Sequence, residues 1–261
     1  MGVIKNRNLA RRKFKSLVSR RSEVLSIHYS QKDLDGIEQI SPMITSIAVR
    51  SLDNSINEIF AIHLEADLLD DTTYDIADLY PELELSMLKK FNEFARKHQQ
   101  YSWVHWDMST QDFGFQAIRH RYIKLAGEKS GRDYKDIPMN KKIDLHLILR
   151  DMYGDKFVVG DDTLFELITI NNNNITDNNY LTRSQESHEF DNRNYHSITS
   201  SLRSKTNSIC YFVTKLIDRK LKVANKNSYA IFLDFISHPL FNLVAWVIGI
   251  LGFVIGLLQA T

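Results

Sequence analysis

The sequence has almost no cysteine, and this absence excludes several classes of protein. Cys210 is the one cysteine in 261 residues. A lone thiol cannot build a disulfide framework or, within one chain, a multi-thiolate zinc site, so we expect a reducing compartment and a packing role for Cys210. Disorder is excluded as well, because 43% of the residues are hydrophobic. That is enough for one soluble domain of roughly 200 residues.

Acidic residues are absent from the first 21 positions, which instead carry eight lysines and arginines. Without these eight, the remaining 25 lysines and arginines face 32 acids, a net charge of −7. A basic arm over 1–22 can bind anionic lipid head groups or nucleic acid, or it can be a solvated tail. It is not predicted to be a secretory signal peptide, because no apolar segment follows the basic residues.

Charge is also absent from a long stretch near the C-terminus. From Pro239 to Gln259 the only polar side chains are those of Asn242 and Gln259. As a helix rising 1.5 Å per residue, this stretch is roughly 30 Å long, which matches the hydrocarbon core of a bilayer. The sequence therefore predicts one transmembrane helix over 237–261, with a buried soluble helix as the alternative. Lysine and arginine lie on its N-terminal side, so we expect the preceding domain in the cytoplasm.

Small residues form one line along this predicted helix. Ala245, Gly249, Gly252 and Gly256 are separated by four, three and four positions, and the last two form a GxxxG pair. Such a line lets helix backbones approach closely in lipid, although glycine is frequent in membrane helices generally. Asn242 is the one side chain able to hydrogen-bond between helices. We expect these five residues to pack a homo-oligomer, with a tetramer favoured.

The pattern of apolar residues predicts an α+β domain with a mixed sheet. Strands are expected at 24–30, 43–49 and 58–64 as an antiparallel meander, followed by a fourth strand at 102–107. Helices are expected after Pro81 to near His98, from about Asp112, at 144–153, at 161–170 and from Ser197 to about Leu221. The asparagine-rich segment 171–179 is predicted to be an irregular loop.

One segment, Val104-His-Trp-Asp-Met-Ser-Thr-Gln-Asp-Phe-Gly-Phe115, carries the most specific pattern. In it a strand ends in His-Trp-Asp, and Asp112 precedes a hydrophobic helix. This resembles the second motif of the DEDD (DnaQ-type) 3′-5′ exonucleases, whose RNase H-like fold has the same order of predicted elements. The resemblance covers about 24–220. It places Asp144 in an Asp-Thr-Leu-like element and His196 where the third motif's histidine is expected.

The first motif of that family is missing. An Asp-x-Glu pair should end the first strand near 29–32, and no acid is present there. Two-metal hydrolysis needs several carboxylates around ions about 4 Å apart, and Lys32 would put a positive charge about where a metal should sit. The resemblance therefore implies a degenerate site with no catalytic residues, no metal and no cofactor. Such a pocket can still bind a single strand through stacking surfaces and cations.

The expected DNA-binding residues are mostly aromatic, basic or hydroxyl side chains near this degenerate site. Trp106 and Phe113 offer π-faces for bases, although core packing is the alternative for each aromatic ring here. Arg119 and Arg121 lie two apart on a predicted helix, so they cannot both face the ligand. The full set is Tyr29, Ser30, Lys32, His105, Trp106, Asp107, Asp112, Phe113, Arg119, Arg121, His196, Ser197 and Arg203.

A degenerate nuclease-like domain joined to one membrane helix also resembles the membrane effector of the bacterial Hailong anti-phage system. The resemblance implies an oligomeric, single-pass channel in the bacterial inner membrane, held closed by short single-stranded DNA. A partner nucleotidyltransferase would make that DNA, an oligodeoxyadenylate being one candidate. The expected division is a basic arm at 1–22, an exonuclease-like domain at 23–205, amphipathic linker helices at 206–236 and a transmembrane helix at 237–261.

Two alternatives stay open. The first is a membrane-tethered, metal-dependent 3′-5′ exonuclease whose acids come from Asp33, Glu38, Asp107, Asp112 and Asp144. The second is a tail-anchored protein that only binds partners. The missing Asp-x-Glu pair favours the effector over the enzyme, and copurifying nucleic acid would favour it over the interaction protein.

Overall fold

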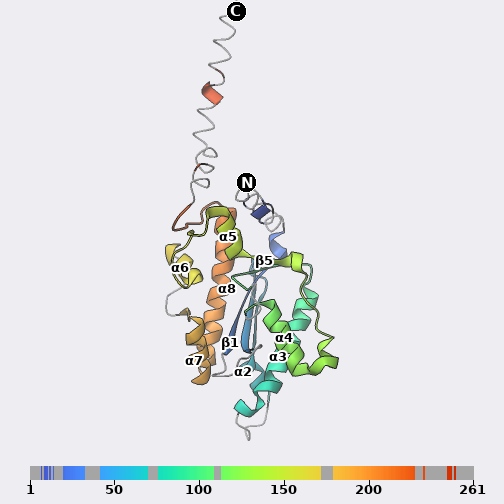
Figure 1. Ribbon diagram of the computed structural model, residues 1–261. Coiled ribbons are helices and arrows are strands. Elements are labelled where there is room, and N and C mark those ends of the chain that lie inside the picture. Colours follow the sequence, from blue (N-terminus) through green and yellow to red (C-terminus); the bar gives the residue numbers. More distant parts are fainter. Residues whose placement is uncertain are drawn as a thin grey trace, which may run out of the picture.

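A five-stranded mixed sheet forms the centre of the domain (Figure 1). Its strands are β1 (Val24–Lys32), β2 (Met43–Ser51), β3 (Asn57–Ala61), β4 (Ser102–His105) and β5 (Lys142–Asp144). Their order across the sheet is β3-β2-β1-β4-β5. The structure is a computed structural model that describes residues 7, 9, 10, 12, 14, 20–32, 42–69, 76–108, 113–171, 179–226, 232, 246–248 and 250.

The first three strands form the predicted antiparallel meander. In it Tyr29 of β1 lies opposite Ile47 of β2, and a bulge interrupts the register between Ser30 and Gln31. On its other edge β1 pairs in parallel with β4, which pairs in parallel with β5. The third strand ends at Ala61, where α2 (Ile62–Ala66) begins, so the strand expected at 58–64 is shorter than predicted.

Helices cover both faces of the sheet (Figure 1). One face contacts α3 (Tyr80–Lys97) and α4 (Phe115–Gly131). The other contacts α8 (Tyr195–Ile217), which lies against β1 and β2. Two further helices, α5 (Leu145–Tyr153) and α6 (Thr163–Ile170), share a core with α8. The remaining helix of this region, α7 (Arg183–Asp191), contacts both β1 and α8.

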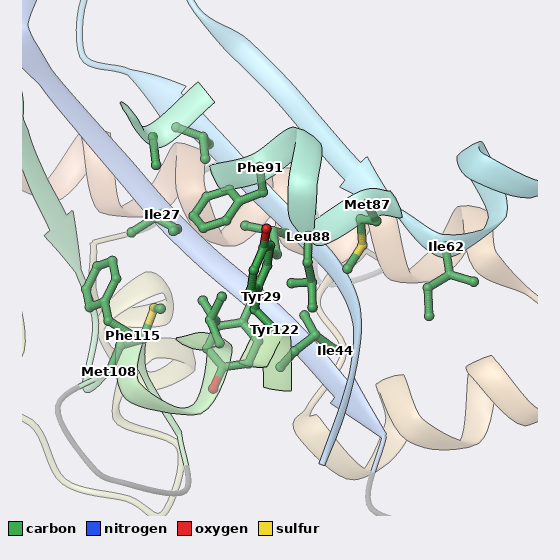
Figure 2. Packing of buried hydrophobic residues seen from close by; sticks show 14 of the residues in the cluster. Ile27, Tyr29, Ile44, Ile62, Met87, Leu88, Phe91, Met108, Phe115 and Tyr122 are labelled. Carbon is green, nitrogen blue, oxygen red and sulfur yellow. The ribbon is translucent and has the colours of Figure 1, made fainter. Parts of the chain in front are cut away.

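Each face of the sheet has its own apolar core. Figure 2 shows the core beneath α3 and α4, where Ile27 and Tyr29 of β1 meet Leu88 and Phe91 of α3. These side chains are at most 1% exposed, and each such burial contributes about 1.5 to 3 kcal/mol. Alternation along β1 therefore assigns its odd-numbered residues to this core. Its even-numbered residues, such as His28, face α8.

The fold prediction needs one correction, which concerns the transmembrane helix at 237–261. Among the described residues, no helix is both long and apolar enough to cross a bilayer. The longest of them, α8, has 23 residues but carries Arg203, Lys205 and Lys215, and these charges do not fit a hydrocarbon core. Five residues predicted to pack the membrane helix lie outside the described residues: Asn242, Ala245, Gly249, Gly252 and Gly256.

At two predicted domain boundaries the residues on the two sides are not structurally separate. At the first they share a core, and at the second they belong to one helix. Ala10 and Phe14 of the basic arm are buried in the same core as Leu216 and Leu221, so this part of the arm packs on the domain. At the other boundary, α8 continues without interruption across position 205. The described domain therefore includes part of the arm and the first residues assigned to a linker.

Candidate functional site

A hollow of about 400 Å³ lies beside β1 and the end of β4. We call it the main hollow. The starts of α6 and α7 and the middle of α8 complete its walls. Its lining residues are His28, Trp106, Asp107, Phe113, Asp161, Asp162, Thr163, Leu164, Tyr180, Arg183 and Lys205.

Strand pairing brings the β1 and β4 residues of the main hollow together. Ser26 lies opposite Val104 in the parallel pair, so two residues further along, His28 and Trp106 become neighbours. The next residue, Asp107, has a φ of 51°, a left-handed conformation that is uncommon outside glycine, asparagine and aspartate. The chain turns there and leaves Asp107 exposed at the hollow.

Trp106 is a largely buried wall of the main hollow. Its side chain is 4% exposed, and its indole Nε1 donates a hydrogen bond to Thr163 Oγ1 at 3.1 Å. The indole also makes an edge contact with the ring of His146 at a centroid distance of 5.3 Å. These contacts fix the indole in one orientation. Trp106 therefore shapes the hollow but offers little area for stacking.

His28 is the side chain that β1 contributes to the main hollow. It is 8% exposed, and its Nδ1 has no hydrogen-bond partner among the described residues. Burial lowers the pKa of His28 well below its ordinary value, and the charges of Lys205 and His105 lower it further. The imidazole is therefore neutral at physiological pH. This strand therefore contributes a neutral polar group to the hollow.

A buried ion pair lies behind His28. Lys205 Nζ of α8 donates to Glu186 Oε1 of α7 at 2.7 Å, and both side chains are buried. The hydroxyl of Ser201 donates to the same carboxylate oxygen at 2.9 Å, which satisfies more of its hydrogen-bonding capacity. The Lys205 ammonium also lies 4.8 Å from the ring centroid of Tyr180. The pair thus joins two helices and places an ammonium group at the hollow.

Tyr180 and Asp162 form a second fixed contact at the main hollow. The Tyr180 hydroxyl donates to both carboxylate oxygens of Asp162 at 2.8 Å. Asp162 also caps the N-terminus of α6 by accepting a hydrogen bond from the Phe165 amide at 3.1 Å. Burial and the neighbouring carboxylate raise the pKa of Tyr180, so its hydroxyl stays protonated. Tyr180 therefore presents its aromatic ring to the main hollow, while its hydroxyl already donates to Asp162.

Aromatic rings and a charged group lie close together where Phe113 borders the main hollow. Its half-buried ring stacks on Tyr29 at a centroid distance of 4.5 Å. The guanidinium of Arg183 lies over the Phe113 ring at 5.3 Å. Asp107 and Asp161 are both exposed at the same hollow. The site therefore combines aromatic faces with an exposed cation and two exposed hydrogen-bond acceptors.

A second hollow of about 180 Å³ borders the same segment, 179–181. We call it the small hollow. It lies between the end of α7 and the start of α8. Its lining residues are Asn179, Leu181, Glu189, Asn194, His196, Ser197 and Ser200.

The structure divides the predicted DNA-binding residues into separate groups. Trp106, Asp107 and Phe113 line the main hollow, whereas His196 and Ser197 line the small hollow. These five residues are therefore near enough to the hollows to contact a ligand. Their role in binding stays a prediction.

Three residues predicted to bind DNA are buried in contacts within the domain. A DNA contact requires an accessible side chain, so their position does not fit that prediction. Tyr29 is 1% exposed, and its hydroxyl accepts a hydrogen bond from the Gly114 amide at 2.8 Å. Figure 2 shows it within the apolar core. Arg121 is buried against Glu84. His105 is buried 3.8 Å from the Asp144 carboxylate, and burial lowers its pKa to about 4.

The remaining predicted binding residues lie away from both hollows or are not described. Ser30 is buried in β1, and Lys32 pairs with Asp191 of α7. Lys32 is therefore directed toward α7, and the lysine that lines the main hollow is Lys205, which is paired with Glu186. Arg119 and Arg203 are exposed on α4 and α8 and line neither hollow. Asp112 lies outside the described residues.

Sequence reasoning missed several residues that line the main hollow, and it missed Glu186, the partner of Lys205. Asp162 could have been found, because an aspartate directly before an apolar helical run is an N-cap signal. His28 carries no comparable signal, since it occurs in an alternating strand pattern. Lys205 and Glu186 come from different helices and are 19 positions apart. No local pattern indicates that these two charges are buried together.

The described part of the chain contains no group of three or more histidine, cysteine, aspartate or glutamate residues placed to hold a metal ion. Asp144, an acid considered for an exonuclease, instead accepts a hydrogen bond from the Leu147 amide at 3.2 Å and caps α5. Two other such acids, Asp33 and Glu38, lie outside the described residues. Comparisons of the whole chain with protein family models, with curated proteins and with solved structures give no match.

Proposed function

We propose that this domain binds short single-stranded DNA without hydrolysing it, and that one nucleotide occupies the main hollow. One observation carries the proposal. The exonuclease resemblance requires carboxylates near 29–32, where β1 has none, and the β1 side chain that lines the main hollow just before them is neutral His28, with the Lys205–Glu186 pair behind it. A neutral imidazole and an ammonium group do not assemble two divalent ions. They can, however, hydrogen-bond to a nucleotide.

The size and lining of the main hollow support one nucleotide as its occupant. A volume of about 400 Å³ falls within the roughly 300 to 1,000 Å³ of small-molecule pockets. The rings of Phe113 and Tyr180 are half-buried, and because Tyr29, Arg183 and Lys205 already lie against their faces, a base packs against the ring edges. Exposed Asp107 and Asp161 accept hydrogen bonds from base amino groups. Arg183 is the exposed cation for a phosphate.

The strand order of the sheet supports an RNase H-like origin for this site. A three-stranded antiparallel meander is extended on one edge by two parallel strands, and helices cover both faces. The main hollow lies beside the two central strands, β1 and β4. The channel prediction depended on a spanning helix, and no described helix can span a bilayer. The proposal is therefore restricted to DNA binding by the domain.

The test is a binding measurement on the full chain with a fluorescein-labelled 12-nucleotide DNA of mixed sequence. Fluorescence anisotropy should show saturable binding. Arg183→Ala and Phe113→Ala should each weaken it by about 5- to 150-fold, the effect of losing 1 to 3 kcal/mol of phosphate or base contact. The matched control is Arg96→Ala, because Arg96 is an exposed arginine near the end of α3 and lines neither hollow.

The same reactions are then supplied with Mg²⁺ or Mn²⁺ and examined for released mononucleotides. Release that Asp107→Ala or Asp112→Ala abolishes would replace the proposal with the exonuclease. Equal losses in Arg96→Ala and Arg183→Ala would show that binding does not depend on the main hollow. An RNA of the same sequence bound more tightly than the DNA would change the class of ligand.

A further inference from the structure

Segment 179–181 lies between the two hollows. Tyr180 lines the main hollow, whereas its neighbours Asn179 and Leu181 line the small hollow. Alternation of this kind arises where successive side chains leave the backbone on opposite sides. The two hollows are therefore neighbours that share one wall. We call this wall the ridge.

The ridge is held in place by contacts on both sides and at its end. The Tyr180 hydroxyl donates to Asp162 at 2.8 Å. The Leu181 amide donates to Ser201 Oγ of α8 at 3.1 Å. Directly after the ridge, Thr182 and Gln185 form a capping box that starts α7. A wall fixed in this way keeps its position when either hollow is filled, so both can be occupied together.

The small hollow offers hydrogen bonds more than stacking surfaces. Asn179 contributes an amide, His196 an imidazole and Ser200 a hydroxyl, whereas the Asn194 amide already donates to Glu189 Oε2 at 2.6 Å. At about 180 Å³ it is smaller than the roughly 300 Å³ at which pockets for whole small molecules begin. It therefore suits one part of a larger ligand. The carboxylate of Glu189 also lines it, which disfavours a phosphate and favours a base that donates hydrogen bonds.

One face of α8 connects the small hollow to an exposed cation. His196, Ser200 and Arg203 are spaced by four and three positions, so they lie in one stripe along the helix. The first two line the small hollow. Arg203 lies one turn further and is exposed. Two positions beyond it, Lys205 lines the main hollow from nearly the opposite side of the helix, so Arg203 belongs with the small hollow only.

We propose that the small hollow is a second nucleotide subsite, so that the ligand is an oligonucleotide whose backbone crosses the ridge. This inference rests on the proposed function, because it takes the main hollow as the first subsite. One base enters the main hollow and the adjacent base enters the small hollow. Arg203, in the same stripe as His196 and Ser200, is placed to contact a phosphate of the nucleotide in the small hollow. The shortest ligand that fills the site therefore has two nucleotides.

The first test compares ligands of different length on the full chain. Isothermal titration calorimetry measures the affinities of a deoxynucleoside monophosphate, a dinucleotide and a tetranucleotide. The dinucleotide should bind about ten times more tightly than the mononucleotide, or better, which is the effect of one additional base contact. The step from two to four nucleotides should be smaller, because the two hollows are then already filled.

The second test removes the small hollow and leaves the main hollow intact. His196→Ala deletes a hydrogen-bonding group, and Ser200→Leu fills the space. Each should abolish most of the gain from one to two nucleotides and leave mononucleotide affinity within about two-fold. The matched control is His120→Ala, because His120 is exposed on α4 and lines neither hollow. Thermal unfolding of each variant checks that it is folded.

The outcomes separate this inference from the proposed function. Equal affinities for one and two nucleotides would overturn the second subsite and leave DNA binding intact. A length gain that persists in both His196→Ala and Ser200→Leu would also overturn it, since the gain would then come from elsewhere. If none of the three ligands binds, the proposed function fails, and the second subsite fails with it.

Discussion

The buried pair of Arg121 and Glu84 allows a structural role to be separated from a ligand-binding role. Arg121 Nε and Nη2 donate to the two carboxylate oxygens of Glu84 at 2.8 and 2.5 Å. The amide of Ile44 donates to the same carboxylate at 2.7 Å. The pair thus links α3, α4 and β2. The sequence predicts Arg121 as a DNA contact, whereas its position predicts a contribution to stability.

The expected size of that contribution follows from burial. Arg121→Met leaves the Glu84 carboxylate buried without its cation, which costs about 3 to 5 kcal/mol. For a domain of about 200 residues, each kcal/mol lowers the midpoint of thermal unfolding by about 2 to 4 °C, so a fall of roughly 6 to 20 °C is expected. The double variant Glu84→Leu with Arg121→Met should recover much of this loss, because it leaves no buried charge.

The assay is thermal unfolding followed by circular dichroism, combined with oligonucleotide anisotropy at a temperature where every variant is folded. The control is Arg119→Met, because Arg119 is exposed two positions away on the same helix and should change stability by less than about 0.5 kcal/mol. Arg121→Met should lower the unfolding midpoint and leave DNA affinity unchanged. An unchanged midpoint combined with lost DNA affinity would refute the structural role and restore the prediction made from the sequence.

Two further predictions concern pH and helix capping. Burial lowers the pKa of His105 to about 4 despite the nearby Asp144, so the folded state disfavours the proton that an unfolded histidine binds below about pH 6.5. Stability should therefore fall as pH drops from 6.5 toward 4, with His105 accounting for about 2 kcal/mol at pH 5. Urea unfolding should show a weaker pH dependence in His105→Asn, and an identical one would disprove this assignment. Separately, Asp162→Ala removes the α6 cap and the acceptor of the Tyr180 hydroxyl, so urea unfolding should show a loss of about 1 to 3 kcal/mol. Asp161→Ala, at its exposed neighbour, should lose little, and equal losses would show that the cap is not the cause.

Much of the fold could be predicted because its signals are local. The strands expected at 24–30 and 43–49 are found as β1 and β2, and the helix expected after Pro81 is found as α3. Strict alternation specifies such strands, and a proline in the first turn marks the start of a helix. The helix expected to open at Asp144 is found as α5, whose first turn is capped by that side chain.

Besides α2, which occupies the end of a predicted strand, two further elements escaped prediction for physical reasons. β5 has only three residues, Lys142–Asp144, too few to show a period. α7 buries only Glu186 and Phe190, so it has no apolar stripe to indicate a helix. Its start was nevertheless encoded, because Thr182 followed three residues later by Gln185 is a capping-box pattern. Attention to caps as well as periodicity would have found it.

The candidate site was predictable only where its residues are adjacent in sequence. Trp106, Asp107 and Phe113 belong to one short segment, and all three line the main hollow. Arg121 belongs to the same region, but its partner Glu84 is 37 positions away. A buried charge and an exposed charge look alike in a sequence until the partner is known. Residues joined only by the fold therefore account for most of what was missed.

The position of the main hollow follows from a change in composition along α8. Its C-terminal half packs by apolar side chains such as Phe212, which is fully buried. Its N-terminal half meets β1 through polar groups, including a hydrogen bond of 3.0 Å from Ser26 Oγ to the Thr206 carbonyl. Buried polar groups need directional partners and cannot fill space as closely as aliphatic ones. The hollow lies in this polar half, between His28 and Lys205, while the apolar half holds the helix to the sheet.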